Sequence, residues 1–380
     1  MSTFSVHAAL ESPRRVLIIA TQQLGDVLLT TPLISAIRAR WPRAHVAVLG
    51  FAGTLALLQG NPEIDERIEV RRGDGLGAKM RLLNRLWRRY DLALVTQAGD
   101  RPALYGWVAA ARRSSVAPQA GTGHGAWWKR RLAVHRVVAE RNRHTVLEKL
   151  LLIEPWLALS ELATVSVRPP AGTRLPDRLQ QDLRPGYLVV HAPSMWRYKQ
   201  WPVEHFRTLI AALLERGHQV VLTGSGAARD QEIVAQLRNL GPQPSLLDAS
   251  QGISLPQVAT LLAGARAYVG PDTSVTHLAA AVGTPVIALF GPTRPTAWGP
   301  WPQRHPASQP WALRGSEPDR VQRVGKVILI QGPSRPGDDC VPCGRAGCDD
   351  HRDSRSECLE GITPAKVLQR VLEVLQLGAA

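Results

Sequence analysis

A chain of 380 residues with 44% hydrophobic and 20% charged residues has a globular composition, and at about 150 residues per domain it is long enough for two domains. Its 46 Lys and Arg against 31 Asp and Glu leave a net charge of +15, which favours an acidic partner such as an anionic membrane surface or a phosphorylated substrate. Nucleic acid is the least favoured acidic partner, because the sequence shows no nucleic-acid-binding motif and offers only five Tyr and four Phe for base stacking.

The sequence predicts neither a membrane span nor a secretory leader. Its apolar runs fall short of the roughly 18 residues that cross a bilayer, and the run at 16–20 is too short for a signal peptide. All four cysteines lie between residues 340 and 358, unlike the spread-out framework of a secreted disulfide protein. We therefore expect a cytoplasmic protein that is at most peripheral to a membrane.

The N-terminal part is predicted to form a βαβ unit. An apolar run at 15–20 is typical of a buried parallel strand, a helical pattern follows from residue 27, and a second strand is predicted at 45–50. Gly25 and Asp26 lie at the strand-to-helix turn, where open α/β sheets bind their ligands. Asp26 is either a helix N-cap or a carboxylate that takes a proton from an incoming hydroxyl.

Further strands are predicted at 67–70 and 92–96, around a basic amphipathic helix at 79–90. Another amphipathic helix begins at residue 144. The segment between them, 101–143, is dense in arginine and tryptophan.

This basic segment has two interpretations. Basic residues interleaved with tryptophan suit an anionic lipid headgroup region or an acidic glycan, but a solvated loop with a few buried tryptophans fits equally well. The candidate acceptor-side residues of this segment are Trp127, Trp128, Lys129 and Arg130, which join Gly25 of the first turn.

The second half repeats the α/β pattern after a proline-rich linker at 166–186. We expect an N-terminal domain at 1–165 and a C-terminal domain at 187–362, with a cysteine-bearing loop at 338–360. A final amphipathic helix within 363–380 is expected to pack back toward the N-terminal domain. Two such domains imply a cleft between them, which is where ligands usually bind.

Within the second half, a strand from residue 187 leads into a loop at 194–200, and Pro202 begins a helix at the position that proline prefers. The next strand ends at Gly224, in a Gly-Ser-Gly run that lacks the third glycine of a dinucleotide-binding fingerprint.

The stretch 267–292 predicts a strand, a tight turn, a helix from residue 273 and a second strand from 285. The side chains of Asp272, Thr273 and Ser274 could cap the helix, and His277 lies one turn later on the same face. The positive end of the helix and these polar groups could instead hold a pyrophosphate.

The four cysteines, Cys340, Cys343, Cys348 and Cys358, are spaced C-x2-C-x4-C-x9-C. They could bind one structural zinc or iron ion, or remain free or labile thiols.

Four motifs in this order resemble those of the ADP-heptose–lipopolysaccharide heptosyltransferases of glycosyltransferase family 9. They are LGDVLLTTPLISAIRARWPRAHVAVL, KQWPVEHF, GPDTSVTHLAAAVGTPVIALFGPT and the cysteine-bearing tail, which resembles the branch that adds a third heptose. The resemblance covers nearly the whole chain. It implies a GT-B fold of two Rossmann-like doubly wound domains with an interdomain cleft, the acceptor on the first domain and the sugar nucleotide on the second.

The resemblance also implies roles for individual residues. Asp26 matches the proposed general base of an inverting transfer, and Lys199 and Ser194 match residues that contact the donor diphosphate. Asp272, Thr273, Ser274 and His277 match the nucleotide-site run, in which Ser274 stands where the family commonly has glycine, and Gly224 is assigned to the same donor site.

The leading hypothesis is therefore an inverting glycosyltransferase that moves heptose from ADP-heptose to the phosphorylated lipid A–core acceptor, at the cytosolic face of the inner membrane. Helix dipole, lysine and histidine could stabilise the leaving phosphate, so no catalytic metal or other cofactor is required. A transferase of the same fold with another nucleotide sugar or a protein acceptor is the alternative. An NAD-dependent dehydrogenase or a nucleotide-binding module is the alternative outside this class.

Overall fold

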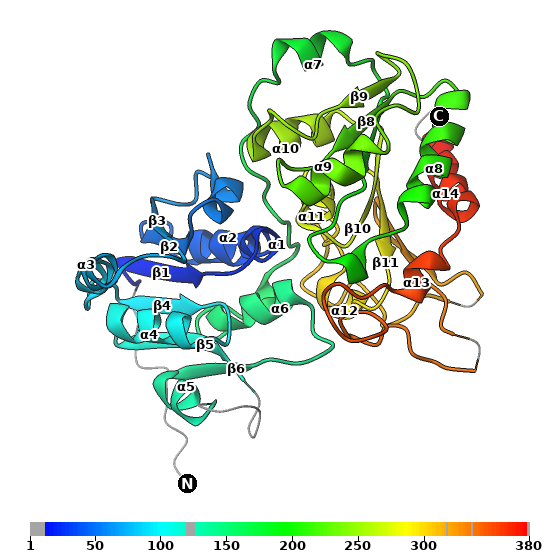
Figure 1. The fold of residues 1–380 in the computed structure, drawn as a ribbon. Coiled ribbons are helices and arrows are strands. Elements are labelled where there is room, and N and C mark those ends of the chain that lie inside the picture. The colour runs from blue at the N-terminus through cyan, green and yellow to red at the C-terminus, as the bar shows by residue number, and fades with distance from the viewer. Residues whose placement is uncertain (1–11, 119–125, 317, 336, 378–380) are drawn as a thin grey trace. The chain divides into compact units, whose positions relative to one another are not determined.

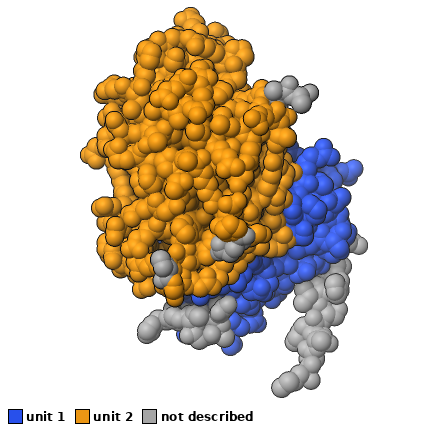
Figure 2. Space-filling view, turned by 90° about the vertical axis from the view of Figure 1, so that its right-hand side faces the viewer, with its two compact units in different colours: residues 1–170, 304–308 blue, residues 171–303, 309–380 orange. Residues whose placement is uncertain are grey.

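The computed structural model describes residues 12–118, 126–316, 318–335 and 337–377 (Figure 1). The chain divides into two compact units, coloured separately in Figure 2: unit 1 is residues 1–170 with 304–308, and unit 2 is residues 171–303 with 309–380. The division after residue 170 falls inside the predicted linker, and the remainder of that segment belongs to unit 2.

Unit 1 contains a six-stranded parallel sheet with the order β3-β2-β1-β4-β5-β6. This is the doubly wound Rossmann order, and the apolar strands β1, β2 and β4 are buried on both faces as that order requires. The strands are β1 (Arg15–Ala20), β2 (His45–Phe51), β3 (Glu66–Val70), β4 (Leu92–Val95), β5 (Arg112–Ala117) and β6 (His135–Val138).

Helices cover both faces of this sheet. One core cluster joins α3 and α4 to the sheet, while α2 packs on α6. The helices are α1 (Leu24–Leu28), α2 (Thr31–Arg40), α3 (Leu76–Leu86), α4 (Asp100–Ala109), α5 (Ala126–Leu132) and α6 (Thr145–Leu150), with 3-10 turns η1 (Thr54–Leu58), η2 (Leu151–Ile153) and η3 (Leu159–Glu161).

The single helix predicted from residue 27 is broken into α1 and α2. Pro32 lies in the first turn of α2, where its missing N–H costs nothing, whereas inside a continuous helix it would remove a backbone hydrogen bond. The strands β5 and β6 were missed altogether, because their arginine, serine and histidine residues lack the apolar run of the other strands.

Unit 2 repeats the same topology. Its sheet has the order β12-β13-β11-β10-β7-β8-β9, in which the six parallel strands follow the Rossmann order and β12 adds an antiparallel edge. The confirmed fold class is thus α/β with two doubly wound domains. The strands are β7 (Leu188–His191), β8 (Val220–Thr223), β9 (Leu246–Asp248), β10 (Ala267–Pro271), β11 (Val286–Phe290), β12 (Val321–Val324) and β13 (Val327–Gln331).

The main core cluster of unit 2 joins β7, β8, β10, β11 and β13 to helices α8, α9 and α14. The helices are α7 (Asp177–Asp182), α8 (Val203–Glu215), α9 (Ala228–Ala235), α10 (Leu255–Ala263), α11 (Ser274–Ala281), α12 (Pro295–Trp298), α13 (Glu357–Glu360) and α14 (Pro364–Leu377), with a 3-10 turn η4 (Arg197–Lys199). Within the described ranges, no helix combines the length and apolarity needed to cross a bilayer.

The last helix packs by one face within unit 2. Val367, Val371 and Val374 recur at helical spacing along α14 and are buried with α8 in the core of unit 2. Arg266 donates to the carbonyl oxygen of Leu375 at 2.7 Å and anchors the end of the helix. The apolar face of α14 is therefore buried within unit 2, and the packing of this helix toward the N-terminal domain stays a prediction.

Candidate active site

The candidate residues of both units follow the carboxyl ends of central strands. In unit 1 the strand order reverses between β1 and β4, and Asp26 follows β1. In unit 2 it reverses between β7 and β10; Ser194 and Lys199 follow β7, and Asp272 follows β10. Such switch points are where doubly wound sheets bind ligands, because the loops diverge there and leave helix N-termini accessible.

Asp26 lies in the first turn of α1, half-buried, and Gln23 occupies the N-cap position instead. The carbonyl oxygen of Asp26 accepts a hydrogen bond from Thr30 Oγ1 at 2.8 Å and one from Lys149 Nζ. The backbone carbonyl of Asp26 is therefore held by one local contact and by one contact from α6. Gly25 precedes Asp26 in the same short helix, and its acceptor-side role stays a prediction.

Lys149 is the principal residue of this turn that the sequence analysis missed. It lies on α6, is 2% exposed, and reaches Asp26 from 123 positions along the chain. Burial lowers the pKa of Lys149 to about 8, against the attraction of the Asp26 and Glu148 charges. The one sequence signal was a lysine followed directly by the apolar residues Leu150, Leu151 and Leu152, although nothing local indicates its partner.

The buried lysine predicts a pH dependence of stability. In the unfolded chain Lys149 titrates near 10.5 but in the folded chain near 8, so between these values the unfolded state binds more protons and stability rises with pH. We expect this one group to add about 2 kcal/mol to the free energy of unfolding between roughly pH 7.5 and 9.5. Urea unfolding of wild type and Lys149→Met measures it, since the variant should lack that increment. Parallel pH profiles for the two proteins would contradict the assignment.

In unit 2, the turn from β10 to α11 depends on a glycine. Gly270 lies beside the ring of Tyr268, and a Cβ at this position would be 2.2 Å from the tyrosine hydroxyl oxygen. That hydroxyl shares a hydrogen bond of 2.9 Å with Thr276, whose own hydroxyl donates to the carbonyl oxygen of Pro271. The buried tyrosine thus ties the first turn of α11 to the end of β10.

Asp272, the first polar residue after β10, does not act as the expected cap. Its carboxylate is 2.6 Å from Lys199 Nζ and 3.8 Å from His277 Nε2, and the Asp272 and His277 side chains are 7% and 5% exposed. Thr273 is the N-cap residue, but its hydroxyl lies 3.3 Å from that of Thr276 instead of bonding an amide. The expected side-chain caps are therefore replaced by a network that orients a lysine and a histidine around one carboxylate.

Three further donor-site candidates, Ser274, Ser194 and Gly224, also lie at the ends of unit 2 strands or at the start of α11. Ser274 begins α11, and Ser194 follows β7 and is 3% exposed. Gly224 follows β8, where a Cβ would lie 3.1 Å from that of Ser250, so close packing already explains the glycine. The structure brings Lys199, Asp272 and His277 together, while the roles of the other residues stay predictions.

The remaining acceptor-side candidates lie on α5, away from Asp26. This helix packs on α4 and β5, whereas α1 packs on η1. Trp127 is 72% exposed, Lys129 pairs with Asp100 at 2.8 Å, and Arg130 donates to the carbonyl oxygen of Pro118 at 3.1 Å. Lys129 also lies over the ring of Trp128, 5.8 Å from its centre.

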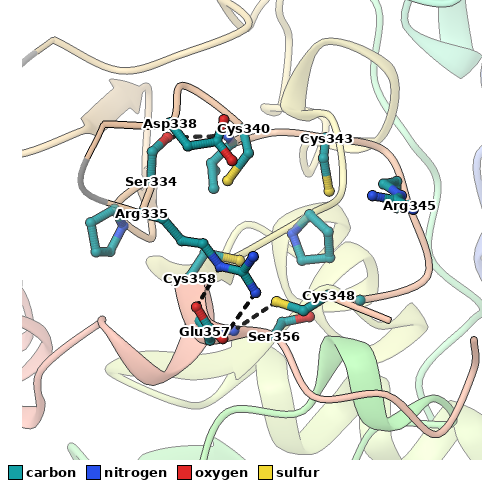
Figure 3. Close-up of a pocket in the computed structure, with 14 residues that line it drawn as sticks. Ser334, Arg335, Asp338, Cys340, Cys343, Arg345, Cys348, Ser356, Glu357 and Cys358 are labelled. Carbon is teal, nitrogen blue, oxygen red and sulfur yellow. Dashed lines mark hydrogen bonds and ion pairs between the residues drawn. The ribbon is translucent and has the colours of Figure 1, made fainter. Parts of the chain in front are cut away.

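The cysteine-bearing loop surrounds a separate cavity of about 270 Å³, shown in Figure 3. Cys340, Cys343, Cys348 and Cys358 all line it. Burial raises the pKa of the Cys358 thiol to about 12, and the neighbouring cysteines add to the shift. Among the residues that the structure describes, no group of three or more Cys, His, Asp or Glu is arranged to hold a metal ion. The four thiols of the predicted metal site therefore line one cavity, but among the described residues they are not arranged as metal ligands.

The comparison with known proteins agrees with this architecture. The sequence pattern of glycosyltransferase family 9 (heptosyltransferase) matches residues 80–323. Lipopolysaccharide heptosyltransferase 3 of Escherichia coli K12 is 28% identical over 287 residues, which cover 73% of this chain and 82% of that protein.

Two solved structures from E. coli share the fold. ADP-heptose lps heptosyltransferase II has a TM-score of 0.69 at 20% identity, with 96% of this chain and 100% of that chain covered. Heptosyltransferase WaaC with ADP has a TM-score of 0.66 at 21% identity, with 95% and 99% covered. Because the family pattern spans well over half of the sequence and the fold agrees over nearly all of it, this chain belongs to glycosyltransferase family 9, the heptosyltransferase family.

Proposed function

We propose that this protein is an inverting heptosyltransferase that moves heptose from ADP-heptose to the inner core of lipopolysaccharide. The observation that carries the proposal is the network of Lys199, Asp272 and His277 at the switch point of unit 2. A similar structure contains ADP, and similar proteins carry the names of lipopolysaccharide heptosyltransferases 2 and 3. The family assignment argues against the alternative that this protein is an NAD-dependent dehydrogenase.

The donor diphosphate is proposed to bind at the start of α11. The helix N-terminus favours an anion, and the Lys199 ammonium supplies the positive charge. In the structure Asp272 neutralises this ammonium at 2.6 Å, so a bound diphosphate shares or takes over the contact. When the glycosidic bond breaks, negative charge grows on the leaving ADP, and the lysine and the helix amides stabilise it most in the transition state.

Asp26 is proposed as the general base. Its carboxylate takes the proton of the acceptor hydroxyl while the oxygen attacks the anomeric carbon and the bond to the ADP oxygen breaks on the opposite face. One displacement of this kind inverts the configuration of the sugar. The reaction requires an acceptor hydroxyl at unit 1 to reach a donor held by unit 2.

Membrane association at the cytosolic face is proposed to use the helical layer α3–α4–α5. Leu76, Met80 and Trp87 at α3 are more than half exposed, and the ring of Trp87 packs edge-to-face on that of Trp107 at 6.4 Å. Residues 71–112 include nine Lys and Arg but only three acidic residues. Exposed tryptophan with surrounding arginine suits the interface of an anionic bilayer, where the phosphorylated lipid acceptor resides.

Vesicle flotation tests this face. We expect wild type to float with vesicles that contain phosphatidylglycerol, and Trp87→Ser/Trp107→Ser or Arg81→Glu/Arg89→Glu to lose most of that binding. Arg216→Glu/Arg238→Glu, at exposed sites of unit 2, is the matched charge control and should float like wild type. Equal loss in both arginine pairs would mean that net charge alone governs binding.

The four cysteines support a proposal of their own, a structural zinc or iron ion. Thiolates suit either metal, but binding requires the side chains to turn further into the cavity. We expect about one zinc or iron ion per chain in protein purified under reducing conditions, and less in Cys343→Ser. Metal-free protein with four freely reactive thiols in elemental analysis and thiol titration would contradict the metal.

Product analysis is the direct test of the function. Wild type is incubated with ADP-heptose or other nucleotide sugars and a truncated core acceptor, and mass spectrometry identifies the product. A mass increase of one heptose only with ADP-heptose supports the proposal. Transfer from another nucleotide sugar, or to a protein acceptor only, would replace it with the alternative transferase.

A further inference from the structure

The cysteine-bearing loop packs closely against the carboxyl ends of the unit 2 strands, the side of the sheet where the proposed donor residues lie. It approaches the ends of β11 and β13 so closely that a Cβ on Gly291 would lie 3.0 Å from Cys358 Sγ, and one on Gly332 would lie 1.8 Å from the carbonyl oxygen of Cys358. Both strands run parallel to β10, whose end leads into Asp272. The loop therefore packs closely on strand ends next to the donor turn.

The same loop contacts the short turn that carries Lys199. Ser356, which is 3% exposed, donates to the carbonyl oxygen of Tyr198 at 2.7 Å. The Arg352 guanidinium lies over the ring of Trp196, 4.3 Å from its centre. These contacts hold the two aromatic residues before Lys199 from one side.

A further contact closes the turn after Lys199. The indole N–H of the fully buried Trp201 donates to the carbonyl oxygen of Ile362 at 2.9 Å, just beyond the loop. The turn η4 is only three residues long, and the lysine side chain then spans the distance to Asp272. Because a lysine side chain has four flexible bonds, the place of its ammonium depends on how firmly its backbone is held.

We propose that Ser356 and Arg352 are positioning residues that hold the Trp196–Lys199 turn so that the Lys199 ammonium meets the donor diphosphate. The inference rests on the proposed donor role of Lys199. It gives the cysteine-bearing loop a function in donor binding, although its thiols lie outside the reaction. Ser356 and Cys358 both line the cavity that the four cysteines surround, so the serine that contacts the Lys199 turn lies in the same loop as the thiols (Figure 3).

Calorimetric titration of the full chain with ADP tests the proposal. We expect Ser356→Ala to bind ADP about tenfold more weakly than wild type, because the Tyr198 carbonyl loses its buried donor and the turn loosens. Ser356→Thr keeps a hydroxyl and should restore most of the affinity. Unchanged ADP affinity in a folded Ser356→Ala would overturn the proposal.

A double-mutant cycle separates positioning from general damage. If Ser356 acts through Lys199, then Ser356→Ala should have little further effect in a Lys199→Ala background. A full additional loss of affinity in that background would show that Ser356 acts on donor binding by another route, and would overturn the positioning role.

Arg352 has a matched control in the same loop. Arg355 is also exposed, but it pairs with Glu357 and Glu360 instead of the tryptophan. We expect Arg352→Ala to weaken ADP binding several-fold and Arg355→Ala to leave it unchanged. An equal loss of ADP affinity in the two variants would contradict a specific role for the contact between Arg352 and Trp196. If wild type itself fails to bind ADP, the proposed function fails; if wild type binds and these variants bind equally well, only the positioning role fails.

Discussion

Replacing Asp26 by alanine or asparagine is expected to abolish transfer while ADP-heptose still binds. Removal of a general base costs about a hundredfold to ten-thousandfold in rate. The donor is proposed to bind through residues of unit 2, so its affinity should change by less than about twofold, a difference too small to reflect a lost hydrogen bond. Single-turnover transfer and equilibrium binding of ADP-heptose measure the two quantities separately.

Asn at position 26 is the sharper variant, because it keeps the volume of the side chain and removes only the base. Asp177→Asn, at a side chain that is 72% exposed in unit 2, is the matched control and should transfer at the wild-type rate. Full turnover by Asp26→Asn would remove this residue as the base. A loss of donor affinity equal to the loss of rate would instead place it in donor binding.

Replacing Lys199 by alanine is expected to weaken ADP-heptose binding by about tenfold to a hundredfold, the value of one charge-assisted hydrogen bond. A second cost follows from the structure. The Asp272 carboxylate, 7% exposed, would lose its partner at 2.6 Å and face the donor diphosphate as a bare like charge. The loss should therefore exceed that of the missing contact alone.

Asp272→Asn tests that second cost. In the Lys199→Ala background it removes the unpaired charge and should recover part of the lost affinity, which a double-mutant cycle of ADP-heptose affinities measures. Lys326→Ala, on the β12–β13 turn of the same unit, is the control and should bind like wild type. Donor affinity unchanged by Lys199→Ala would end its proposed role.

The strands nearest the candidate site could be predicted from sequence because they are buried on both faces. VLIIA in β1 and VIALF in β11 are continuous apolar runs, and a parallel sheet with helices on both faces selects such runs without help from distant residues. The turns that follow β1, β7 and β10 could be predicted for the same reason. The sequence alone thereby places Asp26, Lys199 and Asp272 in the turns that follow these strands.

Other parts of the fold depend on contacts that no local pattern encodes. The polar strand β5 pairs with β4 and β6 through its backbone, so its side chains carry little of the strand pattern. The last helix has an amphipathic pattern that shows one buried face but not what covers it, and α8 turned out to be the partner. The Asp272 side chain forms an ion pair instead of a helix cap because the fold places Lys199, 73 positions away in the sequence, next to its carboxylate.

The sequence by itself determined the two α/β halves, the family resemblance and the polar residues that follow the central strands. Hydrophobic periodicity and turn residues are local, and local patterns suffice for these features. Only the tertiary structure decided that Lys149 lies under Asp26, that Asp272 holds Lys199, and that Ser356 and Arg352 brace the lysine turn. Each of these contacts joins residues 73 to 158 positions apart. A buried polar group needs a hydrogen-bond partner, and the packing of the whole domain determines which distant residue provides it.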